Sequence, residues 1–127
     1  MKTQHSRLWL STGCVLVVLA VMAGAIGSHM VEEGSAQKSF ETAATYHLYA
    51  SLAIVVGAIT SMLWQSKLWL VSFILALAGI IFFSGSLYIK SLAISETAPL
   101  GPFGGICIMA SWAMLALAGI RGARVKE

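Results

Sequence analysis

Four long apolar segments dominate the sequence and limit the folds that the chain can adopt. They cover approximately residues 8–28, 45–64, 68–90 and 103–120. A helix that crosses a bilayer needs about 20 apolar residues, whereas a strand of a membrane barrel needs about half that number. Because lipid offers the backbone no hydrogen-bond partners, segments of this length should be helices. We therefore predict an all-α membrane protein, a bundle of four transmembrane helices.

The composition leaves little material for a soluble part. Only 10% of the 127 residues are charged, whereas soluble domains carry about 25%. We therefore expect a single membrane domain over residues 1–127. The basic residues lie at the ends of the apolar segments, so the net charge of +3 indicates membrane topology rather than a nucleic-acid partner. The lipid bilayer is the partner that this composition predicts.

The segments between the spans differ in character. Residues 29–44 begin with polar residues and then place apolar ones at helical spacing, which predicts a short interfacial helix between the first two spans. Residues 65–67 predict a tight turn, and Pro99 and Pro102 disfavour a continuous helix between the last two spans. The first apolar run, at about 20 residues, is longer than a cleaved signal peptide requires, which favours a retained span.

Small residues indicate how the helices pack. Helices in lipid associate through close backbone contact, which small side chains permit. Spacing of four residues would form a ridge along one helix face in each of the first two spans, and glycines occur in the third. The predicted packing residues are Ala20, Gly24, Ser28, Ala53, Gly57, Ser61, Gly79 and Gly85. A glycine-lined permeation path is the alternative interpretation.

Polar residues gather near one end of the predicted spans, and we call this set the outer polar layer. Its members are His29, Glu41, Tyr46, His47, Ser84, Ser86, Tyr88 and Lys90. Amphipathic side chains near a span end can anchor it at the headgroups and hydrogen-bond between helices. Intramembrane polar groups are also often functional. The layer is therefore either an interfacial anchor or a site for a proton, an ion or a lipid headgroup.

The sequence contains no motif that indicates catalysis. It has no Ser/His/Asp order, no paired carboxylates, no phosphate-binding loop and no Cys/His pattern with zinc spacing. His29 and His47 could approach one another, but two histidines without a third ligand are a weak indication of a metal or haem site. We expect no enzyme activity, no metal and no cofactor.

Three stretches resemble the family of small YgdD-like bacterial inner-membrane proteins, which has mitochondrial relatives. They are residues 24–29 (GAIGSH), residues 40–49 (FETAATYHLY) and residues 83–88 (FSGSLY). His47 departs from the family pattern, which usually has Gln at that position. The resemblance implies a four-helix, multi-pass protein of the bacterial inner (plasma) membrane, and it implies no activity.

Two functions remain open. The first is a non-enzymatic accessory, assembly or structural subunit that acts through another membrane protein or as a homo-oligomer. The second is a small transporter or channel that uses the outer polar layer.

Charge also predicts the orientation in the membrane, since cytoplasmic loops carry an excess of Lys and Arg. With the N-terminus inside, the cytoplasmic side holds Lys2, Arg7, Lys67, Arg121, Arg124 and Lys126, and the outer side only Lys38 and Lys90. A topology reporter fused after Glu127 should therefore report a cytoplasmic C-terminus, and so should one fused before Met1. A periplasmic signal from either fusion would contradict this orientation.

Overall fold

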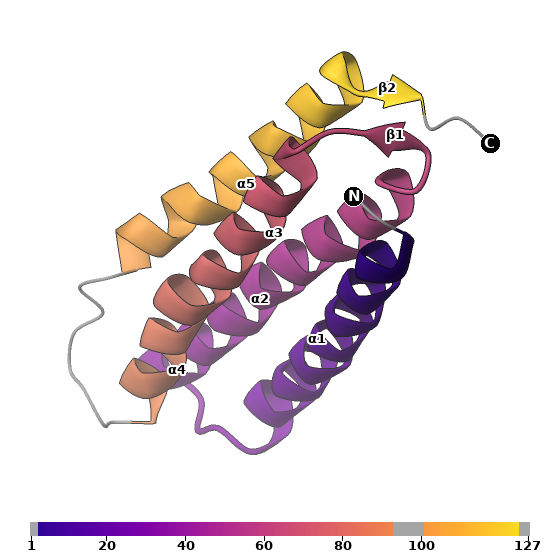
Figure 1. Ribbon diagram of the computed structural model, residues 1–127. Coiled ribbons are helices and arrows are strands. Elements are labelled where there is room, and N and C mark those ends of the chain that lie inside the picture. Colours follow the sequence, from indigo (N-terminus) through magenta and orange to yellow (C-terminus); the bar gives the residue numbers. More distant parts are fainter. Residues whose placement is uncertain (1–2, 93–100, 125–127) are drawn as a thin grey trace.

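The computed structural model describes residues 3–92 and 101–124. Its long helices lie side by side (Figure 1). Its elements are α1 (Thr3–His29), α2 (Ser35–Thr60), β1 (Trp64–Gln65), α3 (Leu68–Gly79), the π-helical turn η1 (Ile80–Ser84), α4 (Gly85–Ser91), α5 (Gly101–Arg121) and β2 (Ala123–Arg124). α3, η1 and α4 form one continuous span. Four helices are long and apolar enough to cross a membrane, which confirms the predicted bundle.

The second span begins ten residues before its predicted start. The expected interfacial helix is not a separate element but the first part of α2, which runs without interruption from Ser35. Gly34 precedes it with a φ of 126°, a conformation that glycine adopts without a steric cost. The last span also begins slightly early, at Gly101, and Pro102 lies in its first turn, where a missing N–H costs no helical hydrogen bond. Pro99 lies outside the described residues.

The connection between α2 and α3 is longer than the predicted turn. α2 ends at Thr60, and Trp64–Gln65 forms a two-residue antiparallel ladder with Ala123–Arg124. This ladder joins the segment after α5 to the segment before α3. The beginning of α1 and the ends of α2 and α5 consequently lie at the same end of the bundle (Figure 1).

α2 is the central helix, since it packs against α1, α3, η1, α4 and α5. Its buried side includes three residues with no exposed surface, Ala50, Ala53 and Ile54. Phe73 from α3 and Ile108 from α5 complete the same hydrophobic core. α1 packs mainly on α2 and forms one side of the bundle.

The small residues of α2 and α3 lie where the helices approach closely. Ala53, Gly57 and Ser61 are buried, as the ridge in the second span requires. A Cβ atom added to Gly57 would lie 2.5 Å from Cε1 of Phe73, so a larger residue would displace α3. A Cβ atom added to Gly79 would likewise come too close to the side chain of Ile108 in α5.

The predicted ridge of α1 is not its packing face. Gly24 has no neighbour within 4 Å of an added Cβ, and Ser28 is exposed. The buried residues of α1 repeat every seven positions and are Ser6, Gly13, Ala20 and Gly27. Such a seven-residue repeat follows the contact line of two helices that cross at a small angle, so only Ala20 belongs to both sets. Gly85 likewise makes only an ordinary contact, 3.7 Å from the carbonyl oxygen of Ile80.

Buried serines connect the helices by hydrogen bonds. The hydroxyls of Ser6 and Ser61 lie 2.8 Å apart and join α1 to the end of α2. Ser72 of α3 donates to the carbonyl oxygen of Ser111 in α5 at 3.0 Å, and Ser111 donates to that of Ser72 at 2.9 Å. Each hydroxyl satisfies its hydrogen-bonding capacity where lipid supplies no partner.

Two glycines of α5 provide a matched test of this packing. A Cβ at Gly104 would overlap the backbone of Phe83, whereas one at Gly119 meets nothing within 4 Å. Gly104→Ala should therefore lower the free energy of unfolding by about 1–3 kcal/mol. Gly119→Ala should leave it within about 0.5 kcal/mol. Thermal unfolding in detergent measures both, and equal effects would contradict the close contact of α5 with η1.

Candidate functional site

His47 is the most enclosed titratable member of the outer polar layer. Its side chain, on α2, is 7% exposed. Its Nδ1 atom lies 3.1 Å from the hydroxyl oxygen of Tyr88 on α4, and the two form a hydrogen bond between the helices. Nε2 is buried and has no hydrogen-bond partner among residues 3–92 and 101–124. When the Tyr88 hydroxyl donates to Nδ1, the imidazole carries its proton on Nε2.

The apolar surroundings of this pair belong to three helices. The ring of Phe40 lies 4.9 Å from that of Tyr88, measured between centroids. A groove of about 330 Å³ runs along the pair, and its other walls are mainly aliphatic residues of α1, including Leu19 and Met22. The His47–Tyr88 pair therefore lies in an almost wholly apolar setting.

The π-helical turn η1 brings the outer end of the third span against α2. A π turn contains one more residue than an α turn and rotates the following residues by about 100°. Ser84, at its last position, is fully buried and donates to the carbonyl oxygen of Ala43 at 2.8 Å. η1 and α4 thereby present Ser84 and Tyr88 to the same helix.

The other members of the outer polar layer do not join this pair. Glu41 is exposed and accepts a hydrogen bond of 3.4 Å from Ser28. The Tyr46 ring packs against Phe83, and Ser86 donates within its own helix. His29 and Lys90 are exposed, and within the described ranges neither is hydrogen-bonded to another member. The structure thus separates buried His47 and Ser84 and half-buried Tyr88, which contact a neighbouring helix, from the other members of the layer.

A second feature is the α1–α2 groove, a depression of about 360 Å³ between these two helices. The ridge that the sequence predicted as a packing face lies along it. Its lining residues are Ala20, Val21, Gly24, Ser28, Glu41, Ala44, Thr45 and Leu48. Five of these residues are no larger than threonine. Their small side chains leave room for a neighbouring helix.

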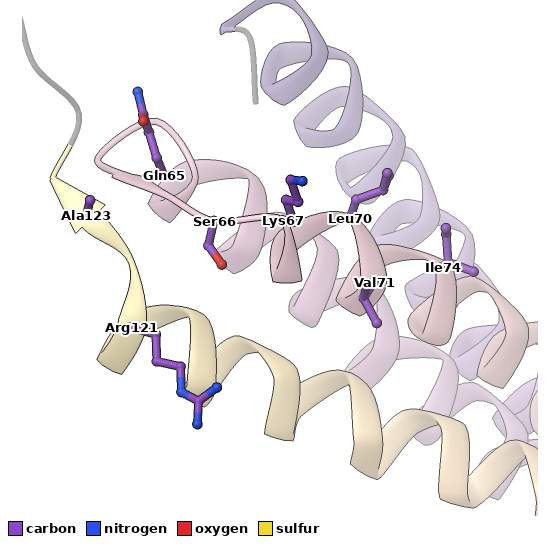
Figure 2. Close-up of a pocket in the computed structure, with 8 residues that line it drawn as sticks. All are labelled: Gln65, Ser66, Lys67, Leu70, Val71, Ile74, Arg121 and Ala123. Carbon is purple, nitrogen blue, oxygen red and sulfur yellow. The ribbon is translucent and has the colours of Figure 1, made fainter.

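A third feature, the basic groove, lies at the opposite end of the bundle between α5 and the segment that begins α3 (Figure 2). Its volume is about 740 Å³. It is lined by Gln65, Ser66, Lys67, Leu70, Val71, Ile74, Arg121 and Ala123. The sequence predicted that Lys67 and Arg121 lie on the same side of the membrane. It did not predict the groove, because the groove depends on the β1–β2 ladder and strands of two residues have no recognisable sequence pattern.

Taken together, four helices that are long and apolar enough to span a membrane, and the small-residue contacts between them, define a multi-pass helical membrane protein. The comparison with known families agrees with this class. A family described as "Protein of unknown function (DUF423)" matches residues 23–105, so the chain belongs to it. A comparison with solved structures finds no match.

Bacterial relatives match over nearly their whole length. The chain is 31% identical to the UPF0382 membrane protein YwdK of Bacillus subtilis, over 91% of this chain and 98% of that protein. It is 34% identical to SAB0533 of Staphylococcus aureus, over 88% and 94% respectively. It is 31% identical to the inner membrane protein YgdD of Escherichia coli, over 91% and 92%. These matches confirm the resemblance found in the sequence motifs.

The His47–Tyr88 contact predicts a specific loss of stability. Tyr88→Phe removes the hydroxyl and leaves His47 without its partner on α4, so the free energy of unfolding should fall by about 0.6–1.7 kcal/mol. Tyr49→Phe is the matched control, since Tyr49 lies two residues from His47 on an exposed face of α2. Unfolding in detergent should distinguish the two variants. A Tyr88→Phe protein as stable as the Tyr49→Phe protein would contradict the contact.

Proposed function

We propose that the protein is a non-enzymatic accessory or assembly subunit that binds another membrane protein, or a second copy of itself, through the α1–α2 groove. The supporting observation is that Gly24 and Ser28, two of the three residues of the Ala20–Gly24–Ser28 ridge, lie outside the buried face of α1. An added Cβ at Gly24 meets nothing within 4 Å, although the same spacing in α2 is buried at every position. The ridge is therefore available to a helix from outside.

The position of α1 supports the same proposal. In its most apolar stretch only 17% of the residues are buried, compared with 50% in α2. In lipid, apolar exposure alone does not favour association, because acyl chains solvate leucine and valine as well as another helix does. A small-residue groove differs, since a partner helix can approach its backbone closely and gain van der Waals contact.

Photo-crosslinking in native membranes tests this proposal. A photoreactive residue at Val21, which lines the groove, should yield a crosslinked protein adduct. The same residue at Ile106, which is 59% exposed on α5, is the matched control and should yield none. Gly24→Leu fills the groove and should abolish the Val21 adduct while the protein remains folded, because among the described residues nothing lies within 4 Å of a Cβ atom added at Gly24.

Two results would contradict the accessory role. One is a solitary monomer by native mass spectrometry with no protein adduct at Val21. The other is solute flux in liposomes that is lost on substitution of His47, Tyr88 or Lys90. The second result would favour the transporter or channel, for which the supporting observation is that Nε2 of His47 has no hydrogen-bond partner among the described residues.

A further inference from the structure

The basic groove combines positive charge with an apolar wall. Lys67 begins the third span and Arg121 ends the fourth, and both side chains are exposed. Among residues 3–92 and 101–124, no acidic side chain lines the groove. The remaining wall is formed by exposed aliphatic side chains, with Leu70 46%, Val71 43% and Ile74 56% exposed. A bound group should therefore be anionic at one end and apolar at the other.

The local fold holds the polar end of this groove in place. The β1–β2 ladder pairs Gln65 with Ala123, which keeps the residues after Arg121 beside the turn before α3. The Ser66 hydroxyl accepts a hydrogen bond from the backbone N–H of Leu68 at 3.2 Å, and its own proton can still donate. The buried Trp69 donates to the carbonyl oxygen of Trp64 at 2.8 Å, which ties the connection before α3 to the core.

We propose that the basic groove binds one anionic phospholipid. Its phosphate contacts Arg121 and the Ser66 hydroxyl, and one acyl chain lies along Val71 and Ile74. Basic grooves between transmembrane helices bind the headgroups of anionic lipids in this manner. A zwitterionic lipid would bring its ammonium group close to two cations. A soluble anion would leave the apolar wall unused.

The two cations have different roles in this proposal. In Figure 2 Ser66 and Val71 point toward α5, which carries Arg121, whereas Lys67 and Leu70 point to the other side of the turn. The Arg121 side chain extends along α5 away from Ser66 in this view, so it must rotate about its side-chain bonds to meet a phosphate at Ser66. Arg121 is therefore the group assigned to the phosphate, which its planar guanidinium can bind through two hydrogen bonds. Lys67 raises the local positive potential without a fixed contact.

Native mass spectrometry of the full chain in detergent tests the site. The probes are phosphatidylglycerol, phosphatidylcholine with the same acyl chains, and inorganic phosphate. Phosphatidylglycerol should be retained in preference to phosphatidylcholine, and inorganic phosphate should not compete with it. Arg121→Gln should weaken phosphatidylglycerol binding by about fivefold, with a smaller effect from Lys67→Gln. Val71→Trp should also weaken it, because the indole occupies the chain-binding wall without changing the charge.

Arg7→Gln is the matched control, since Arg7 is an exposed cation at the same end of the bundle but outside the groove. It should bind phosphatidylglycerol like the unmodified protein. An equal loss in Arg7→Gln and Arg121→Gln would overturn the proposal and indicate a diffuse surface potential. Equal retention of the two lipids, or displacement by inorganic phosphate, would also overturn it. The site is separate from the α1–α2 groove, so these results do not depend on the proposed accessory role.

Discussion

Close approach of helix backbones is the constraint on which this structure depends. Lipid solvates apolar side chains as well as protein does, so the helices are held together by contacts that only small residues allow. Gly104 permits the backbone of Phe83 to lie against α5, and Gly57 permits Phe73 of α3 to lie against α2. Serine hydroxyls fit into the same narrow spaces and, as the reciprocal bonds of Ser72 and Ser111 show, add direction to the contact.

This packing also positions the polar groups. Phe83, which lies against Gly104 of α5, belongs to η1. This π-helical turn changes which side of the third span the following residues occupy. Beyond that turn, Tyr88 faces α2 and meets His47. At the other end, the two-residue β1–β2 ladder keeps the end of α5 beside the turn before α3 and so creates the basic groove. Both features depend on how α5 packs against the third span.

The three grooves differ in the chemistry that they offer. The groove at His47 is apolar apart from one hydrogen-bonded pair. The α1–α2 groove offers small residues to a helix, and the basic groove offers cations and aliphatic side chains to an amphipathic molecule. All three include apolar side chains of the predicted spans among their lining residues, which suits ligands and partners that are themselves membrane components. This is consistent with a chain of 127 residues whose connections are too short to form a soluble domain.

The sequence by itself determined the number of spans and their helical form, because segments of this length must satisfy their backbone hydrogen bonds within lipid. It also contained the motifs that resemble the family. It could not determine which face of each helix is buried. Spacing of four and of seven residues both produce ridges of small residues, and only the crossing of α1 with α2 buried Gly27 and left Gly24 open. The outer polar layer was predicted as one set, since its members share a depth, but depth does not specify rotation about a helix axis. The tertiary structure decided that His47, Tyr88 and Ser84 turn toward a neighbouring helix while His29 and Lys90 do not. In the third span the π-helical turn sets this rotation, because its extra residue shifts the face on which the following residues lie.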